Sequence, residues 1–187
     1  MRVVGGKFGG TPLAVPKGRG TRPTSDRTRE ALFSILMARP SLDLDGARIV
    51  DLFAGTGALG LEALSRGAGF CLFVDSEAGP RGVIRSNCEA CGVIGLSKIY
   101  RRDATRLGPR PASAGPAFDV VFADPPYGKQ MAEAALRALI EGDWLAPAAL
   151  VIVEEDKRSH FVAPEGYVEH DRRQYGDTEL VFLEVSA

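Results

Sequence analysis

Three features are missing from this chain of 187 residues, and each absence narrows what the protein can be. No apolar run approaches the roughly 18 residues that a membrane-spanning helix needs. The opening MRVVGGKFGG lacks the apolar core of a signal peptide, and no internal repeat is present. We therefore expect a cytoplasmic, monomeric protein without a membrane partner, and its 45% hydrophobic content suits one well-buried domain.

Cysteine and histidine are also rare. The three cysteines are an odd number, which does not indicate a disulfide framework. Cys88 and Cys91 have CxxC spacing but fall inside an expected helix, with no second pair and no histidine at metal-ligand spacing. His160 and His170 also lack a partner at such spacing and are expected at the surface. The sequence therefore predicts no metal site.

The net charge of −1 conceals an uneven distribution. Residues 1–40 have a net charge of +6, because eight Lys and Arg stand against Asp26 and Glu30, so the remaining residues carry −7. The first twenty residues are also rich in glycine, which lets a basic loop come close to phosphates. This composition indicates a polyanion-binding arm, although a soluble flexible tail would look similar. The expected contacts are the basic side chains Arg2, Lys7, Lys17, Arg19 and Arg22.

Helices and strands alternate along the rest of the chain. A helix is expected after Pro23, with Thr24 or Ser25 as its N-cap, and further helices around residues 62–65, 77–91 and 131–140. Apolar, partly β-branched runs predict strands at residues 48–53, 70–74, 97–100, 120–123, 149–153, 166–169 and 179–185. An alternation that ends in a β-hairpin predicts a three-layer, Rossmann-like α/β domain with a mostly parallel sheet. We expect a basic arm and helix over residues 1–40 and the main domain over residues 41–187.

A glycine-rich turn joins the first of these strands to a helix. Gly55, Gly57 and Gly60 satisfy the GxGxxG pattern in this context, which lets the backbone approach a nucleotide closely. Asp75 ends the next strand, 18 residues beyond Gly57, where a carboxylate can hold both hydroxyls of a ribose; a solvated strand-end carboxylate is the alternative. Asp103 follows the third strand and suits either an adenine amine or the cap of the next turn.

The stretch 118–128, FDVVFADPPYG, has the most specific chemistry in the chain. Its strand ends in a corner that Pro125 and Pro126 stiffen, because both prolines fix φ and lack a backbone N–H. Asp124 and the carbonyl of Pro125 can each accept one hydrogen of a planar amine, while the Tyr127 ring stacks on the attached base. Two such acceptors direct the nitrogen lone pair toward an electrophile and stabilise the charge that develops on it. The alternative is a purely structural Asp-Pro turn.

These motifs together resemble a known family. Four motifs resemble those of class I S-adenosylmethionine-dependent methyltransferases that act on exocyclic amines, in both their order and their spacing. They are VDLFAGTGALGLEAL (50–64), FVDSE (73–77), RRDA (101–104) and FADPPYG (122–128). Bacterial 16S ribosomal RNA guanine methyltransferases of the RsmD type are similar in the opening RVVGGKFGG, in TRPTSDRTREALFSIL (21–36) and in QYGDTELVFLEV (174–185). The resemblance covers nearly the whole chain.

The resemblance implies a class I methyltransferase fold with a seven-stranded sheet, S-adenosylmethionine as the cofactor, and methyl transfer to the 2-amino group of one guanine in 16S ribosomal RNA. The implied partner is the small ribosomal subunit or its assembly intermediate, contacted by the basic arm. The catalytic residues implied by motif are Asp124, Pro125, Pro126 and Tyr127. The implied cofactor-binding residues are Asp51, Ala54, Gly55, Thr56, Gly57, Asp75, Ser76, Asp103, Ala104 and Asp124. The chain departs from the family where Asp75 replaces a common glutamate, and residues 108–116 match no motif.

The expected mechanism is direct in-line transfer without a metal or a covalent enzyme intermediate, because the sulfonium already carries an activated methyl group. Asp124 then orients the amine rather than acting as a strong base, since the amine proton becomes acidic only once the methyl group has begun to bond. Three other functions fit parts of the sequence: an adenine 6-amino methyltransferase of DNA or RNA, a NAD-dependent oxidoreductase, and a non-catalytic RNA-binding module. The oxidoreductase leaves residues 124–127 without a role, and the short chain favours RNA over DNA.

Overall fold

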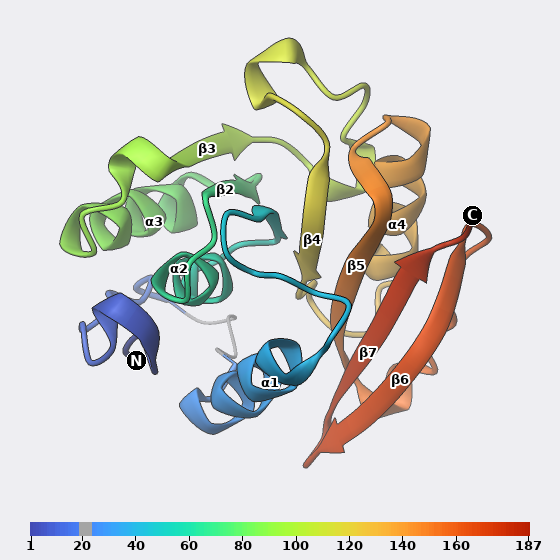
Figure 1. Cartoon of the computed structure of the whole chain (residues 1–187), viewed down its shortest axis with the longest axis horizontal. Helices are drawn as coiled ribbons and strands as arrows, with labels where there is room; N and C mark the ends of the chain where they lie inside the picture. The colour runs from blue at the N-terminus through green and yellow to red at the C-terminus, as the bar shows by residue number, and fades with distance from the viewer. Residues whose placement is uncertain (19–23) are drawn as a thin grey trace.

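The computed structural model describes residues 1–18 and 24–187, and in this part of the chain one seven-stranded sheet has helices on both faces (Figure 1). The strand order is β3-β2-β1-β4-β5-β7-β6. The strands are β1 (Arg48–Leu52), β2 (Phe70–Asp75), β3 (Ser97–Arg101), β4 (Phe118–Ala123), β5 (Leu145–Asp156), β6 (Tyr167–Tyr175) and β7 (Thr178–Val185). The α-helices are α1 (Asp26–Ala38), α2 (Ala58–Ser65), α3 (Ala78–Ala90) and α4 (Met131–Glu141). Short 3-10 helices include η1 (Gly6–Phe8), η3 (Ala104–Arg106) and η4 (Ala112–Ala114).

The directions of the strands confirm the predicted fold class. Strands β1 to β5 pair in parallel, β7 pairs antiparallel with β5, and β6 pairs antiparallel with β7 as a terminal hairpin. Helices α1, α2 and α3 contribute Leu32, Leu61 and Ile84 to the apolar layer on one face of the sheet. Helix α4 covers the other face, where Leu136 and Trp144 lie in a second apolar layer.

The order of the strands fixes where a ligand can bind. Strand β1 pairs with both β2 and β4, so the chain winds outward in opposite directions from this point. The connections that leave the carboxyl ends of β1 and β4 therefore diverge to opposite faces and leave a crevice between them, which is where open α/β sheets bind their ligands. The predicted glycine turn and the predicted Asp-Pro corner are these two connections.

Two strands are longer than the sequence pattern predicts. The strand expected at residues 149–153 extends over all of β5, because β5 pairs with β7 as far as Asp156 and with β4 at Leu145. The strand expected at residues 166–169 extends to Tyr175 as β6, although most of its side chains are exposed. Both extensions come from cross-strand pairing, which is invisible in the local pattern of apolar residues.

The N-terminal residues form a packed segment of the domain. Val3 and Leu13 are buried in the same apolar layer as α1 and α2, and Arg2 forms a β-bridge with Pro12. Glu62 of α2 accepts hydrogen bonds from the backbone N–H groups of Val4 and Gly5, both at 2.8 Å. These contacts exclude the flexible-tail alternative for residues 2–13, whereas the division at residue 41 stays a prediction.

None of the helices in residues 1–18 and 24–187 has the length and apolar content that crossing a membrane requires.

Candidate active site

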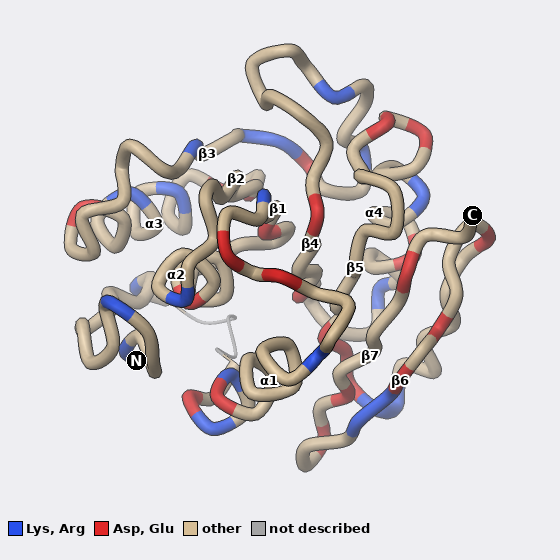
Figure 2. The backbone as a smooth tube through the Cα atoms, in the orientation of Figure 1, with Lys and Arg blue, Asp and Glu red and all other residues tan. Residues whose placement is uncertain are grey.

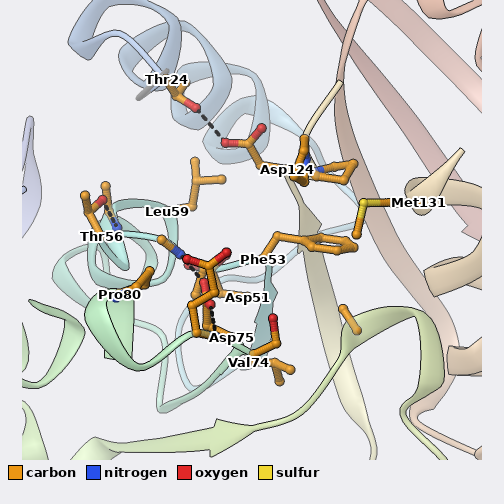
Figure 3. Close-up of a pocket in the computed structure, with 18 of the residues that line it drawn as sticks. Thr24, Asp51, Phe53, Thr56, Leu59, Val74, Asp75, Pro80, Asp124 and Met131 are labelled. Carbon is orange, nitrogen blue, oxygen red and sulfur yellow. Dashed lines mark hydrogen bonds between the residues drawn. The ribbon is translucent and has the colours of Figure 1, made fainter. Parts of the chain in front are cut away.

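A cavity of about 250 Å³ lies at the carboxyl ends of β1, β2 and β4. Figure 3 shows Asp51 and Asp75 at one end of this cavity and Asp124 with Thr24 at the other. The structure therefore brings together the predicted cofactor loop and the predicted base-binding corner. The predicted residues that line the cavity are Asp51, Ala54, Gly55, Thr56, Asp75, Ser76, Asp103, Ala104, Asp124, Pro125, Pro126 and Tyr127.

Two strand-end carboxylates hold the glycine turn in place. The Gly55 N–H donates to Oδ2 of Asp75 at 3.0 Å, and the Gly60 N–H donates to Oδ2 of Asp51 at 3.0 Å. Gly55 has φ = 57°, a left-handed conformation that glycine adopts without strain. The turn is thus fixed before any ligand binds.

The other two glycines of the pattern serve packing. A Cβ on Gly60 would lie 2.5 Å from both Cys71 Sγ and the Phe73 ring, so only glycine lets α2 pack this closely on β2. Gly57 caps α2 with φ = 76°, and a Cβ there would lie 3.2 Å from Phe73. Gly57 is not among the described residues that line the cavity, and its contact with a cofactor stays a prediction.

Asp51 is almost completely buried and 1% exposed. Burial raises the pKa of its carboxyl to about 8, and the neighbouring Asp75 carboxylate adds to this increase. A neutral Asp51 can still accept the Gly60 hydrogen bond while it presents a proton donor to the cavity.

Asp75 ends β2 at the rim of the cavity and is half-buried. Besides the Gly55 contact, its Oδ1 accepts from the Glu77 N–H at 2.9 Å, at the start of α3. Each carboxylate oxygen has a second lone pair, so the two oxygens can still accept from a pair of ligand hydroxyls. The short aspartate is therefore already oriented for the ribose role predicted for it.

Asp103 performs one of its two predicted roles. Its Oδ1 accepts from Thr105 N at 2.9 Å and from Thr105 Oγ1 at 2.6 Å, which caps η3. These hydrogen bonds lower the pKa of Asp103. The residue also lines the cavity, so capping fixes the carboxylate while Oδ2 is available for an adenine amine.

The corner after β4 presents its aspartate and its tyrosine to the cavity. Asp124 and Tyr127 are half-buried, whereas Pro125 is buried and Pro126 is exposed. The Tyr127 hydroxyl lies 3.5 Å from Thr178 Oγ1, at the start of β7. Tyr127 lines the cavity and is not sealed in the core, so its ring can stack on a base that enters.

Asp124 has an unusual electrostatic environment. Thr24 Oγ1 lies 3.4 Å from Oδ2 of Asp124 and donates a 2.5 Å hydrogen bond to Oε2 of Glu154, which is 4% exposed. Burial and the negative charge of Glu154 raise the pKa of Asp124 well above its usual range. Asp124 therefore has a higher proton affinity than an ordinary aspartate.

Several cavity residues were not predicted from the sequence. Phe53, Pro80 and Met131 supply apolar walls, Arg102 lies beside Asp103, and Thr24 lies beside Asp124. Phe53 follows β1 with φ = 55°, an uncommon conformation for an aromatic residue. Phe53 directly precedes the glycine turn and Arg102 directly precedes Asp103, so these two positions had a signal in the sequence. Thr24, Pro80 and Met131 reach the cavity only through the tertiary fold.

Three of the predicted RNA-contacting residues are described, and none of these three is among the residues that line the cavity. Arg2, Lys7 and Lys17 are exposed, and Arg2 Nε lies 3.6 Å from Asp26. Arg19 and Arg22 lie outside the described residues. In the part of the chain that the structure describes, Figure 2 shows Lys and Arg on several separate elements, among them the N-terminal segment, α1, α3, β3 and β6. The RNA role of these side chains stays a prediction.

Among the residues that the structure describes, no group of three or more His, Cys, Asp or Glu could hold a metal ion. Cys71, Cys88 and Cys91 are free thiols and buried. The donor set of the cavity instead fits an adenosyl cofactor, since a carboxylate at the end of β2 faces an apolar wall that includes Pro80 and Val74.

Comparison with known proteins extends over almost the whole chain. A family model described as "Conserved hypothetical protein 95" matches residues 1–184. The "Putative rRNA methyltransferase YlbH" of Bacillus subtilis is 34% identical over 179 residues, which cover 95% of this chain and 95% of the relative. Ribosomal RNA small subunit methyltransferase D of Escherichia coli is 36% identical over 156 residues, which cover 83% and 75% of the two chains.

A solved structure agrees with these relatives. The "Putative methyltransferase yhhF" of Escherichia coli superposes with a TM-score of 0.82 and 28% identity, covering 99% of this chain and 97% of that chain. The family expected from the motifs and the class I methyltransferase fold are both confirmed. With a match that begins at its first residue and ends three before its last, this chain belongs to the family described as Conserved hypothetical protein 95, whose relatives include ribosomal RNA small subunit methyltransferase D.

Proposed function

We propose that this protein is an S-adenosylmethionine-dependent methyltransferase that modifies the exocyclic 2-amino group of one guanine in 16S ribosomal RNA. The observation that carries the proposal is the shared cavity, in which Asp124 and Tyr127 face the turn that Asp75 holds at Gly55. The names of the relatives, which specify ribosomal RNA and the small subunit, support the substrate class.

The cofactor is assigned to the end of the cavity formed by the glycine turn. Asp75 would accept from its ribose hydroxyls, Asp103 from its adenine amine, and the backbone at Gly55 would lie along its methionine part. When bound, S-adenosylmethionine supplies a methyl group already activated by the sulfonium charge. The protein needs only to align the amine, exclude water and accept one proton.

The target base is assigned to the corner after β4. Asp124 and the Pro125 carbonyl accept the two hydrogens of the amine, which aims the nitrogen lone pair at the methyl group. Tyr127 stacks on the base and fixes its plane. A base inside a helix cannot enter this site, so the guanine is unpaired or flipped out of its stack.

Asp124 also receives the proton that methylation releases. As the new N–C bond forms and the S–C bond breaks, positive charge develops on the nitrogen and its proton becomes acidic. The raised pKa of Asp124 makes its carboxylate a competent acceptor for that proton. The products are then the neutral methylated amine, the neutral thioether and a protonated Asp124.

We further propose the small ribosomal subunit, or its assembly intermediate, as the macromolecular partner of a monomeric enzyme. A ribosomal substrate makes the cytoplasm the site of the reaction. The exposed Arg2, Lys7 and Lys17 are candidate contacts with the RNA backbone. An adenine 6-amino group presents the same two hydrogens to the corner, so adenine is the alternative target.

The first test uses Asp124→Ala and, as a matched control, Asp119→Ala at the opposite, exposed end of β4. Asp124→Ala is expected to abolish transfer of labelled methyl groups to methylation-deficient 16S RNA or small subunits, while calorimetric titration shows nearly unchanged S-adenosylmethionine binding. Asp119→Ala is expected to retain both activities. A loss of cofactor binding as large as the loss of transfer would contradict the separate roles of the two ends of the cavity.

A further inference from the structure

Thr24 occupies a place that helix capping does not explain. It lies two residues before the first residue of α1, where Ser25 is the N-cap and accepts from the Thr28 N–H at 3.1 Å. The Thr24 side chain is instead turned into the cavity and is only 8% exposed. Its hydroxyl is therefore used for something other than starting the helix.

The partners of this hydroxyl are two carboxyl groups from distant parts of the chain. Thr24 Oγ1 lies 2.5 Å from Oε2 of Glu154 and 3.4 Å from Oδ2 of Asp124, and the second of these contacts is visible in Figure 3. Glu154 lies near the carboxyl end of β5, next to the end of β4. It is 4% exposed and is not among the described residues that line the cavity, and it follows Val153, the partner of Ala123, so it lies beside Asp124.

We propose that Thr24 is a positioning residue that joins Asp124 to Glu154, so that the proton taken from the substrate amine passes through the Thr24 hydroxyl to the buried glutamate. This inference rests on the methyl transfer proposed above and names two residues behind the reacting groups. The protonated Asp124 donates to Thr24 Oγ1 while the Thr24 hydroxyl proton moves to Oε2 of Glu154. Asp124 becomes an anion again, Glu154 becomes neutral, and no other reactant is consumed.

The direction of the relay follows from the shape of the site. A stacked base and a bound cofactor would occupy the cavity that Asp124 faces and would keep water from its carboxyl during the reaction. The Thr24 hydroxyl offers an inward path, and its single proton already points to Glu154 at 2.5 Å. Thr24 thus also fixes the orientation in which Asp124 presents its other oxygen to the amine.

The charged groups around Asp124 set the expected signs. The negative charges of Glu154 and Glu155, and that of Asp51 where it is ionised, raise the pKa of Asp124. The buried guanidinium of Arg29 on α1 interacts electrostatically with Glu154. Removing the Glu154 charge therefore lowers the pKa of Asp124.

The test compares Thr24→Val, which keeps the shape without the hydroxyl, with Thr24→Ser, which keeps the hydroxyl, and with Glu154→Gln. In the free protein, the midpoint of the Asp124 carboxyl titration is followed by ¹³C NMR. Relative to wild type, the midpoint is expected to fall in Glu154→Gln by about one pH unit or more and to change little in Thr24→Ser. A midpoint that Glu154→Gln leaves unchanged would overturn the inference, whether or not the protein methylates RNA.

The second readout is the methyl-transfer rate against pH, with melting temperatures confirming that each variant folds. Thr24→Val is expected to lower kcat by about tenfold or more, to leave the KM for RNA and the cofactor affinity within about twofold, and to shift the acid limb of the pH–rate profile. Thr24→Ser should restore the wild-type rate and pH profile. An unchanged kcat in Thr24→Val beside an active wild type would refute the relay alone, whereas an inactive wild type would refute the proposed function.

Discussion

Replacing Glu62 with glutamine tests how the N-terminal segment is attached to the domain. Glu62 is fully buried in α2, and its two oxygens accept hydrogen bonds from the Val4 and Gly5 N–H groups, both at 2.8 Å. Oε1 also accepts from Arg66 Nε at 3.0 Å. Glutamine keeps the size of the side chain but replaces one acceptor oxygen with an NH₂ donor that faces a backbone donor.

The structure gives a magnitude for this substitution. One charge-assisted hydrogen bond to a backbone N–H is removed outright and the other is weakened, at about 1.5–3 kcal/mol for each bond to a charged group. The salt bridge to the partly exposed Arg66 is also removed, which adds about 1 kcal/mol at most. We therefore expect Glu62→Gln to lower the free energy of unfolding by about 2–4 kcal/mol and the melting temperature by about 5–15 °C.

Hydrogen exchange locates the effect. The amides of Val4, Gly5 and Phe8 are expected to lose protection in Glu62→Gln, although Phe8 donates to Ser65 and not to Glu62, because the segment detaches as a unit. The same change at the exposed Glu89 of α3 serves as the control and should have no measurable effect. Unchanged protection at Val4 and Gly5, or a melting temperature equal to that of the control, would refute this attachment.

Three further predictions concern the cavity and the RNA surface. The pKa of Asp51 is raised to about 8 in the folded protein, so its contribution to stability is complete below the unfolded pKa of about 4 and is lost as pH rises through 8. In denaturant titrations from pH 5 to 9, the free energy of unfolding should decline less steeply with pH for Asp51→Asn than for wild type. An identical decline would contradict the assigned burial cost. Asp75→Ala removes the acceptor of the Gly55 N–H and should weaken S-adenosylmethionine binding by about tenfold or more in calorimetry, whereas unchanged affinity would argue against the ribose role. Neutralising the exposed Arg2, Lys7 and Lys17 with glutamine should reduce the slope of log affinity for RNA against log salt by about 0.7–0.9 for each side chain that pairs with a phosphate in the wild type, and an unchanged slope would remove these residues from the RNA-binding surface.

The packing of the N-terminal segment makes substitution of Arg2, Lys7 and Lys17 a cleaner test of RNA binding than deletion of the segment. Deleting residues 1–20 would remove Val3 and Leu13 from the apolar layer that they share with α1 and α2. A decrease in RNA affinity after such a deletion would then combine unfolding with the removal of charge. Side-chain substitutions on the exposed face separate these effects.

The parts of the site that could be predicted from the sequence are those that local chemistry encodes. Gly55, Asp75 and Asp124 lie at or just after the end of a strand, and Gly60 lies in the helix that follows the glycine turn. The residue type at each position is required by a turn, a close contact or a carboxylate contact. Parallel strands bring their carboxyl ends to one edge of the sheet, so the sequence also predicted that these residues would meet.

The remainder depends on contacts between distant residues that no local pattern records. Thr24 and Glu154 are 130 positions apart and meet only because β5 lies beside β4 and the residues before α1 cross the same edge. The attachment of Val4 to Glu62 is similarly remote in sequence, and a glycine-rich basic stretch resembles a loose arm until its partners are known. The extent of β6 was missed for the same reason, because an exposed edge strand has little apolar signal.

The most direct measurement of the central claim is to find the methylated atom. Purified protein is incubated with labelled S-adenosylmethionine and small subunits from a strain that lacks the corresponding methyltransferase, with duplex DNA as a parallel substrate, and the digested nucleosides are identified by mass spectrometry. The account predicts one N2-methylguanosine per 16S RNA, formed by the wild-type protein and absent with Asp124→Ala. Label found in N6-methyladenosine, in DNA, or in equal amounts with Asp124→Ala would contradict it.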